Sequence, residues 1–291
     1  MYGFCRGIHK LIGLVYSTKD PAGTGISHYI SELFNCEEVD IPRSVTAVRI
    51  KDLNAILVGF SEDVIYFDFL DNVLDVDLYI ILSRHSAESG IKSLTVHHTG
   101  NPYGRASFGG NPYELSIANP PLSKMLLVKL SELRSRYGLT EFQVVYEATH
   151  HGPSNLSKPL SFIEIGSSIS EWKLTKAHKV VGDAVIEAVR EYLSTKVKCT
   201  GSVGFGGQHY SSTFTERALS TDECYGHIIP RYAINMLKND DPEKMKYIFR
   251  QAMLKNSIKI ERAVVLKKLS KIVKDSVKEL ASKLNVEFFI A

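Results

Sequence analysis

The sequence predicts an α/β protein in which a mixed β-sheet lies between two layers of helices. Short apolar segments of strand composition alternate with amphipathic segments of helical spacing along the chain, and this alternation is typical of three-layer α/β folds. Histidines stand at the ends of four predicted strands, and the carboxyl ends of strands bind ligands in open α/β sheets. No repeat or linker interrupts the pattern, so we expect one domain over residues 1–291.

The composition sets limits on the class of protein. The apolar fraction of 44% is ordinary for a globular chain, and the net charge of +3 does not by itself indicate nucleic-acid binding. The four cysteines are scattered without a CxxC pair, which argues against a zinc ribbon or a disulfide framework and fits a reducing cytoplasm. No signal-peptide pattern and no apolar run of membrane-spanning length is found. We therefore expect a soluble cytoplasmic protein without a membrane or obligatory protein partner.

In the first half of the chain, a buried strand at 11–17 leads through a glycine-containing loop at 18–25 into a helix at 26–34. This arrangement can hold a phosphate at a helix N-terminus, but the P-loop motif is absent and a tight turn explains it more simply. Residues 101–121 form a long irregular loop, and such loops are often functional. The other expected elements are strands at 55–60, 77–82 and 93–96 and a helix at 121–137.

The second half continues the alternation. Strands are expected at 142–148 and 160–166, followed by an amphipathic helix at 175–193 and a glycine-rich segment at 203–210. The remaining expected elements are short helices at 230–237 and 242–254, a helical pattern at 257–284 in one or two pieces, and a closing strand at 286–290.

The densest group of reactive side chains is Glu147-Ala148-Thr149-His150-His151-Gly152-Pro153, which follows an apolar strand and ends in a turn. A solvated polar turn is the simpler explanation for one histidine. Two adjacent histidines and a carboxylate, together with histidines at three other strand ends, favour a site. Glu164 lies in the next buried strand, and buried carboxylates need partners. Metal ligation supplies one, and histidine with Glu or Asp is a hydrolytic zinc set.

The alternation of side chains along a strand does not decide which residues of this group are ligands. Side chains alternate between the two faces of a strand, so Glu147, Thr149 and His151 share a face. His150 points to the other face unless the strand has already ended. The same ambiguity applies to the histidine pair at 97–98.

Two further segments suggest substrate contacts. The glycines of 204–210 allow close approach of the backbone to a ligand, and its N–H groups suit an oxyanion or a phosphate. A turn that needs positive φ explains the glycines equally well, and His209-Tyr210 favours a function. Residues 255–283 carry nine lysine and arginine residues against three acidic ones, which suits a polyanion such as RNA. A solvated helix face is the alternative, and no aromatic residue lies there to stack on bases.

Several of these segments together resemble the archaeal and plant D-aminoacyl-tRNA deacylase family. The resemblance runs from about residue 10 to the C-terminus, and EATHHGP and GGxHY are its most distinctive parts. Gln208 departs from the family pattern, in which a third glycine is expected. The segments are Ser17-Thr18-Lys19-Asp20-Pro21-Ala22, Ser83-Arg84-His85-Ser86, Leu94-Thr95-Val96-His97-His98-Thr99-Gly100-Asn101, Tyr146-Glu147-Ala148-Thr149-His150-His151-Gly152-Pro153, Phe162-Ile163-Glu164-Ile165-Gly166-Ser167 and Gly204-Phe205-Gly206-Gly207-Gln208-His209-Tyr210.

The resemblance implies a phosphorylase/hydrolase-like fold, zinc dependence and hydrolysis of the ester between a D-amino acid and the 3′ acceptor end of tRNA. Glu147 would orient or deprotonate a water molecule, and Thr149 would bond the substrate or the ligands. A basic helical portion at about 255–284 would approach the acceptor-stem phosphates. Metal ligands are expected among His98, His150, His151, Glu164 and His209. Substrate contacts are expected from His85, Tyr210 and the N–H groups of Gly206 and Gly207.

Two other functions remain open at this stage. A metal-dependent small-molecule hydrolase, such as a peptidase or amidohydrolase, or a nucleoside phosphorylase-like enzyme would use the same kind of fold without a basic segment. The HxxE spacing of His85 and Glu88 is a weak sign of a peptidase. A non-catalytic RNA-binding protein would give no reason to gather glutamate and histidine at strand ends.

Overall fold

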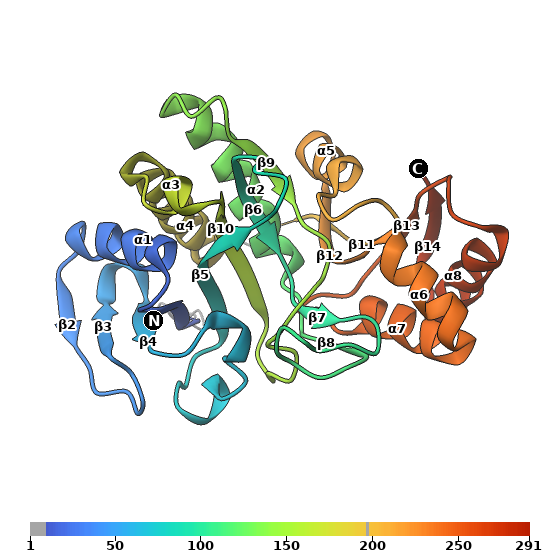
Figure 1. Ribbon diagram of the computed structural model, residues 1–291, viewed down its shortest axis with the longest axis horizontal. Coiled ribbons are helices and arrows are strands. Elements are labelled where there is room, and N and C mark those ends of the chain that lie inside the picture. The colour runs from blue at the N-terminus through green and yellow to red at the C-terminus, as the bar shows by residue number, and fades with distance from the viewer. Residues whose placement is uncertain (1–9, 196–197) are drawn as a thin grey trace, which may run out of the picture.

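The computed structural model describes residues 10–195 and 198–291. The larger of its sheets has eight strands in the order β2-β3-β4-β1-β5-β10-β6-β9 (Figure 1). The central strands β4, β1, β5 and β10 run parallel, whereas β6 is antiparallel to β10. The strands are β1 (Ile12–Ser17), β2 (Cys36–Glu38), β3 (Thr46–Ile50), β4 (Ala55–Phe60), β5 (Leu78–Ser86), β6 (Ser93–His97), β9 (Gln143–Tyr146) and β10 (Leu160–Ser167).

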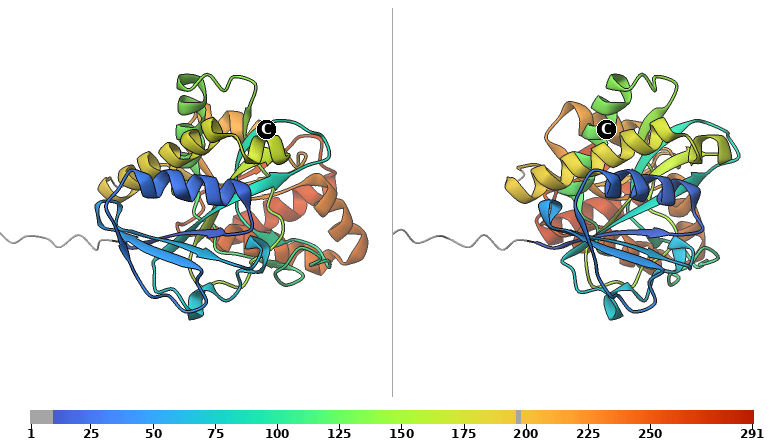
Figure 2. Two further views of the ribbon diagram at one scale, coloured as in Figure 1. Left: turned by 60° about the vertical axis from the view of Figure 1, so that its left-hand side comes forward. Right: turned by 90° about the vertical axis from the view of Figure 1, so that its left-hand side faces the viewer.

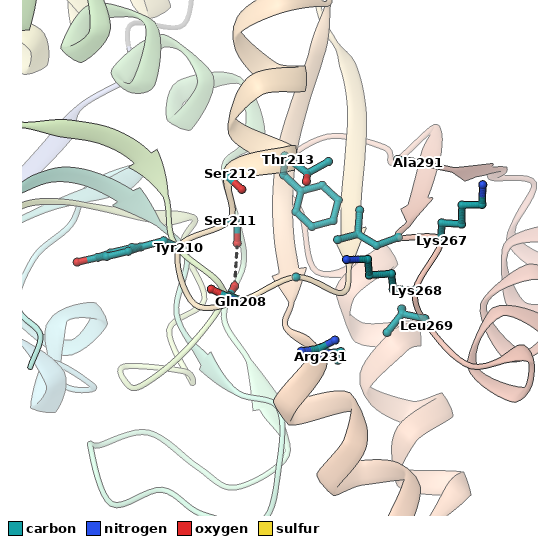
Figure 3. Close-up of a pocket in the computed structure, with 13 residues that line it drawn as sticks. Gln208, Tyr210, Ser211, Ser212, Thr213, Arg231, Lys267, Lys268, Leu269 and Ala291 are labelled. Carbon is teal, nitrogen blue, oxygen red and sulfur yellow. Dashed lines mark hydrogen bonds between the residues drawn. The ribbon is translucent and has the colours of Figure 1, made fainter. Parts of the chain in front are cut away.

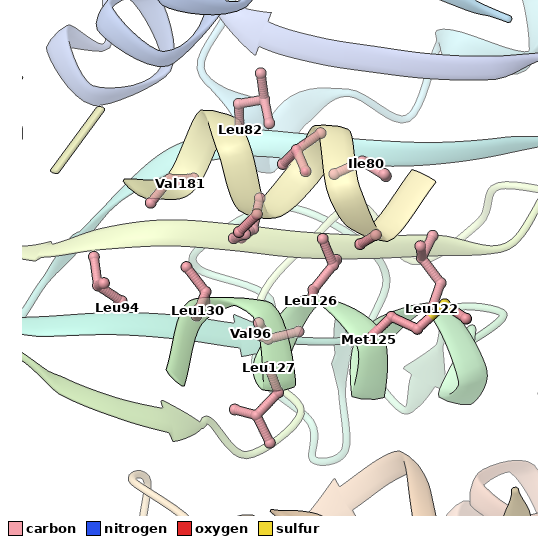
Figure 4. Packing of buried hydrophobic residues seen from close by; sticks show 14 of the residues in the cluster. Ile80, Leu82, Leu94, Val96, Leu122, Met125, Leu126, Leu127, Leu130 and Val181 are labelled. Atoms are coloured by element: carbon pink, nitrogen blue, oxygen red, sulfur yellow. The ribbon is translucent and has the colours of Figure 1, made fainter. Parts of the chain in front are cut away.

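Helices cover one face of this sheet, and the core lies between them. The expectation of an α/β fold with a mixed sheet flanked by helices is confirmed, with α-helices on one face and short 3-10 helices on the other. Leu82 of β5 and Val96 of β6 pack against Leu126 of α2 and Val181 of α4 (Figure 4). Truncation of one such buried leucine to alanine costs roughly 2–5 kcal/mol, so this layer fixes the strand positions. The helices are α1 (Pro21–Glu32), α2 (Pro120–Arg136), α3 (Ile169–Trp172) and α4 (Thr175–Ser194).

The opposite face of the large sheet is covered by less regular structure. Short 3-10 helices at η2 (Val64–Tyr66) and η3 (Leu70–Asn72) pack there on a second apolar cluster that includes Ile81 and Phe162. A further 3-10 helix, η1 (Lys51–Leu53), precedes β4. Val64 and Ile65 of η2 also line the cavity that lies beside the strand ends on this face.

A second sheet follows the first in the chain and lies beside it in space (Figures 1 and 2). The sequence did not lead us to expect this sheet. Its four strands are parallel and lie in the order β12-β11-β13-β14. Its elements are β11 (Thr200–Phe205), α5 (Ser212–Ser220), β12 (Glu223–Ile229), α6 (Arg231–Asp240), α7 (Pro242–Leu254), β13 (Arg262–Val265), α8 (Lys271–Leu284) and β14 (Glu287–Ile290). A small hairpin, β7 (Gly100–Asn101) and β8 (Glu114–Leu115), lies in the long loop.

The predicted basic helix is wrong over its first half. Residues 262–265 form the buried strand β13, and the helix begins only at Lys271. The β-branched pair Val264-Val265 favours a strand, and its pairing with β11 and β14 decides the outcome. The basic residues of this segment are therefore divided between a strand, a turn and a helix.

The first helix also begins earlier than expected, at Pro21 instead of Ile26. Asp20 is its N-cap and accepts hydrogen bonds from the N–H groups of Ala22 and Gly23 at 2.8 and 3.2 Å, and proline suits the first helical position. A Cβ on Gly23 would lie 2.6 Å from the carbonyl oxygen of Leu82. The glycine therefore allows α1 to lie close against β5, and it does not form a phosphate loop.

The expectation that the cysteines form no disulfide is wrong for one pair. Cys199 and Cys224 are joined, with their Cα atoms 5.8 Å apart. They become neighbours because β11 and β12 pair in parallel at Gly201 and Cys224, a contact that sequence spacing does not reveal. The cysteine pattern thus no longer supports a reducing compartment. Among the described residues, no helix is both long and apolar enough to cross a bilayer.

Candidate metal centre

The site begins with the pairing of three strands in the large sheet. In β10, Glu164 pairs with Ser83 of β5 on one side and with Thr95 of β6 on the other. Paired residues point to the same face, and so do residues two positions apart on a strand. His85 and His97 therefore share the face of Glu164, which is the face opposite helices α2 and α4.

Glu147 joins the same group because β9 continues beside β6. The backbone N–H of Glu147 donates to the carbonyl of Val96 at 3.0 Å, one position beyond the pairing of Tyr146 with Val96. The regular strand ends there. His151 has a positive φ of 44°, and the turn that it forms directs both His150 and His151 towards His97, with ring centroids 4.4 and 4.9 Å away. Parity excludes neither histidine, since the strand has already ended.

The glycine-rich loop after β11 supplies the last histidine. Glu147 forms an antiparallel bridge with Tyr210, and the N–H of Ala148 donates to the carbonyl of His209 at 2.8 Å. This pairing brings His209 to Glu147 from the second sheet. The site therefore lies where the two sheets meet.

Glu147 is the centre of the cluster. Its Oε2 lies 2.8 Å from Nε2 of His209 and 3.6 Å from Nε2 of His150, and its Oε1 lies 3.1 Å from Nδ1 of His85. Both oxygens are buried, yet neither has a partner in hydrogen-bond alignment among the described residues. Short approaches without hydrogen-bond alignment are what ligands converging on a shared cation would show, because their lone pairs point to a common point and not at one another.

Glu164 forms the other carboxylate of the cluster. Its Oε2 lies 3.5 Å from Nδ1 of His85 and 3.6 Å from Nε2 of His97, while its Oε1 accepts a hydrogen bond of 2.5 Å from Ser83. The buried Nε2 of His97 likewise lacks an aligned hydrogen-bond partner among the described residues. The ligand atoms of three groups lie within 4.8 Å of one another: His97, His150 and His151; His85, Glu147 and His209; and His97, Glu147 and Glu164.

Three of the histidines are oriented by backbone carbonyls. Nδ1 of His97, His150 and His151 lies 3.2, 2.8 and 2.6 Å from the carbonyl oxygens of residues 98, 148 and 152, respectively. A carbonyl can only accept, so each Nδ1 carries a proton, and in the neutral ring Nε2 keeps a free lone pair. Ligating histidines in metal sites are commonly held in this way.

The charges of the cluster support the same arrangement. Burial, reinforced by neighbouring imidazoles, lowers the pKa of His151 to about 4 and that of His150 well below its usual range. Both rings are therefore neutral at pH 7 and available as ligands. Burial alone would lower the pKa of His85, but the carboxylates of Glu147 and Glu164 outweigh it and raise the pKa to about 11. At pH 7, His85 thus carries a positive charge against the two carboxylates.

A cavity of about 710 Å³ opens above the cluster and is large enough for a small ligand. Its floor includes His85, His150, His151, Glu164 and His209. The other walls combine charged residues with exposed or half-buried apolar side chains, among them Asp20, Asp63, Arg84, Tyr103, Phe108, Tyr232 and Met236. Burial is the main reason that the pKa of Asp20 rises to about 6.

Most of the side chains that the sequence singled out come together here. His85, Glu147, His150, His151, Glu164 and His209 belong to the cluster. The hydroxyl of Tyr210 lies 2.9 Å from Nε2 of His85, so Tyr210 orients His85 from the side away from the carboxylates. His97, which we did not select as a ligand, occupies the place expected for His98. Pairing of β6 with β10 was the signal that would have chosen between them.

His98, Thr149 and Gly206 are not brought into the cluster. The ring of His98 lies on the other face of the sheet, with Nε2 at 2.8 Å from the hydroxyl of Ser123 and Nδ1 at 3.1 Å from the carbonyl of Gly226. Burial lowers its pKa to about 3, and both ring nitrogens are already engaged. His98 therefore supports the packing of β6 on α2 and the second sheet.

Thr149 and Gly206 are engaged by β12. The hydroxyl of Thr149 accepts the N–H of Ile228 at 3.1 Å and lies 3.2 Å from Nδ1 of His227. The N–H of Gly206 donates to the carbonyl of Ile229 at 2.8 Å and is not free for a substrate. Gly207 remains at the edge of the loop, where it lines a different cavity.

Comparison with known proteins adds an independent finding. The sequence profile of the D-aminoacyl-tRNA deacylase family matches residues 72–289. A D-aminoacyl-tRNA deacylase of Desulfurococcus amylolyticus is 48% identical over 236 residues, covering 81% of this chain and 85% of that protein. The deacylase of Hyperthermus butylicus is 37% identical over 281 residues, covering 95% and 99%. A crystal structure of a conserved protein of unknown function superposes with a TM-score of 0.86 at 31% identity, covering 97% of this chain and 95% of that one.

Proposed function

The chain belongs to the D-aminoacyl-tRNA deacylase family, and we propose that its histidine–carboxylate cluster is the zinc centre of that reaction. The protein hydrolyses the ester bond of D-aminoacyl-tRNA and releases free D-amino acid and tRNA. The observation that carries the proposal is Glu147, whose two buried oxygens approach three histidines without hydrogen-bond alignment. We place the reaction in the cytoplasm, where charged tRNA is found.

The donor set fits zinc. Imidazole nitrogens with carboxylate oxygens are the usual ligands of catalytic zinc, which has three protein ligands and one open position. His97, His150 and His151 best meet this requirement, because their ligand atoms lie within 4.8 Å of one another, their rings are fixed through Nδ1, and burial keeps His150 and His151 neutral. A zinc ion bound there would act as a Lewis acid on the ester carbonyl and lower the pKa of a water molecule to about 7.

His85, Glu147 and His209 form a second group that can hold a cation. Glu147 belongs to both sides of the cluster, since its Oε2 lies 3.6 Å from His150 and 2.8 Å from His209. We assign to Glu147 the role of orienting the attacking water and accepting its proton. Glu164 holds His97 and His85 in place from the adjacent strand, with Ser83 fixing its other oxygen.

The cavity above the cluster is large enough for the reacting end of the substrate. The reacting end of the substrate is an amino acid esterified to an adenosine, and the 710 Å³ cavity has exposed Phe108 and Tyr232 beside the charged floor. These aromatic side chains offer apolar contact to the amino-acid side chain or the adenine. Residues at the cavity wall would exclude the L-enantiomer by their shape.

The test is a comparison of two substrates with and without metal. D-Tyr-tRNA and L-Tyr-tRNA are incubated with protein that has been stripped by a chelator, and zinc is then returned. We expect D-Tyr-tRNA hydrolysis to disappear on chelation and to return with zinc, while L-Tyr-tRNA stays intact. Full activity of a demonstrably metal-free sample would refute the metal centre.

A pair of adjacent substitutions sharpens the test. His97→Asn removes a ring that faces the cluster, whereas His98→Asn removes a ring that faces Ser123 and Gly226. Bound zinc is measured by atomic absorption on folded protein of each variant. His97→Asn should lose zinc and His98→Asn should keep it. Equal zinc contents in the two variants would argue against the assignment of His97.

A further inference from the structure

A second cavity, of about 490 Å³, is shown in Figure 3. The glycine-rich loop lines both this cavity and the catalytic cavity. Gly207 and Gln208 line this cavity, whereas the next residue, His209, lines the catalytic one. The ring of Tyr210 points away from the other labelled residues (Figure 3) and reaches His85 with its hydroxyl. The rest of the lining is Ser211, Ser212, Thr213, Phe214, Arg231, Leu266, Lys267, Lys268, Leu269 and Ala291.

At the start of helix α6, too, neighbouring residues line different cavities. Arg231 lines the second cavity, and its neighbour Tyr232 lines the catalytic cavity. Consecutive Cα atoms are about 3.8 Å apart. Two separate segments therefore pass from one cavity to the other in a single residue, so the two cavities lie next to each other with these segments between them.

Three cationic side chains surround the second cavity: Arg231, Lys267 and Lys268. All three are exposed, and within the described residues none forms an ion pair with a carboxylate. Other basic residues of the same C-terminal segment are paired: Lys255 with Glu114, Arg262 with Glu223 and Glu287, Lys271 with Asp275 and Lys283 with Glu279. The unneutralised charge beside the active site therefore lies in the β13–α8 turn and at the start of α6.

The remaining walls suit the other parts of a nucleotide. Phe214 and Leu269 are buried apolar residues at the floor, and Leu266 is half-buried beside them. Ser212 and Thr213 present hydroxyl groups from the first turn of α5. Base and ribose can pack on the apolar floor while the phosphate faces the cations.

We propose that this cavity binds the nucleotide that precedes the terminal, aminoacylated adenosine of the tRNA. Its phosphodiester contacts Arg231, Lys267 and Lys268, and its base lies against Leu266 and Leu269. The inference rests on the proposed function, because it takes the aminoacylated adenosine to occupy the catalytic cavity. It places the tRNA contact in a cavity next to the site and not along the outer face of helix α8.

The test uses a double substitution with a matched control. Lys267→Gln/Lys268→Gln removes two charges from the cavity, and Lys259→Gln/Lys278→Gln removes two unpaired charges from the same segment outside it. Each protein is assayed on D-Tyr-tRNA and on 3′-O-D-tyrosyl-adenosine, which has no phosphate. The cavity variant should raise KM for D-Tyr-tRNA about tenfold and lower the slope of log KM against log salt by about 0.7 per lost phosphate contact. Hydrolysis of D-tyrosyl-adenosine should be unchanged.

A dinucleotide gives a direct probe of the same cavity. Cytidylyl-(3′→5′)-adenosine should inhibit the wild-type enzyme about tenfold more strongly than adenosine, a gain of one phosphate contact and one base. The cavity variant should lose this advantage and the control variant should keep it.

Each other result has a defined meaning. Equal KM increases in the cavity variant and the control would show that only net charge matters, and would overturn the proposal. Equal losses on D-Tyr-tRNA and D-tyrosyl-adenosine would show that the lysines only hold the catalytic loop, which would also overturn it. A wild-type enzyme inactive on D-Tyr-tRNA would instead refute the proposed function, so the two failures are distinguishable.

Discussion

Two buried glutamates of this protein are held in opposite ways. Glu223, in the second sheet, accepts hydrogen bonds from Arg217 at 2.8 and 2.6 Å, from Arg262 at 2.8 Å and from Tyr225 at 2.6 Å. Glu147, at the junction of the sheets, is equally buried but has no aligned donor among the described residues. The first carboxylate is fully satisfied within the protein, and the second is surrounded by groups that suit an added cation.

The difference teaches how a buried charge indicates its role. A carboxylate whose lone pairs are all used by arginine and tyrosine contributes to the fold, since nothing remains for a ligand. A carboxylate that is buried without aligned partners is costly in isolation, and it persists where a ligand or a reaction uses it. The predictions below separate these two roles.

The largest effect is expected on catalysis. Glu147→Gln keeps the shape of the side chain but cannot accept a proton, so kcat for D-Tyr-tRNA should fall by roughly 10²–10⁴-fold. Glu223→Gln should keep nearly the wild-type kcat per folded molecule, because it lies in the structural network. Single-turnover assays at saturating enzyme measure both. Equal losses in the two variants would remove the distinction between the two glutamates.

The next largest effect is on stability, where Glu223→Gln should have a larger effect than Glu147→Gln. Glu223→Gln leaves two arginines without their carboxylate and should lower the free energy of unfolding by about 3 kcal/mol. Glu147→Gln should lower it by less, because the attraction that is lost to His209 and His85 is partly offset by the smaller desolvation cost of the amide, and Glu164 still faces His85. Urea unfolding of metal-free protein measures both values. A larger loss for Glu147→Gln would contradict this comparison.

The dependence of the free energy of unfolding on pH, below about pH 4.5, gives a second test of the role of Glu223. Burial would raise the pKa of Glu223, but Arg217, Tyr225 and Arg262 lower it to about 2. A folded-state pKa below the unfolded one stabilises the protein above the unfolded value of about 4.5, and this contribution disappears as the pH falls from 4.5 to 2. The stability difference between wild type and Glu223→Gln should therefore shrink over that range. A difference that stays constant from pH 6 to pH 3 would argue against ionisation of Glu223 as its source.

Zinc should stabilise the protein through the histidine–carboxylate cluster and not through the network around Glu223. At a free zinc concentration 100-fold above Kd, ligand binding to the folded state adds about 2.7 kcal/mol of stability. Wild type and Glu223→Gln should gain this amount equally, whereas His97→Asn should gain much less. Thermal unfolding with and without zinc provides the measurement, with His98→Asn as the neighbouring control.

The smallest effect concerns Thr149. Thr149→Val leaves the buried N–H of Ile228 without its acceptor and should cost about 1 kcal/mol of stability. Because the hydroxyl faces β12 and not the cluster, kcat on folded protein should stay within about twofold of wild type. A loss of activity comparable to that of Glu147→Gln would restore Thr149 to the catalytic group.

The sequence by itself identified many strands of the larger sheet and most of the histidine and glutamate residues that form the cluster. Apolar runs such as 12–17 and 55–60 are buried on both sides, so their composition alone identifies them as strands. The clustering of histidine and glutamate at strand ends identified most of the cluster, because buried ionisable groups are expensive and seldom gathered without a use. The resemblance to the deacylase family was carried by those same residues.

Only the tertiary structure decided which neighbours face the site. Pairing of β6 with β10 selects His97 over His98, and the end of β9 at Tyr146 lets His150 and His151 both enter the cluster. The second sheet, with its strand at 262–265 and its disulfide, arises from long-range strand pairing. A local pattern records which residues are apolar or reactive, but not which distant strand lies beside them, and that partner fixes the register and hence the direction of every side chain.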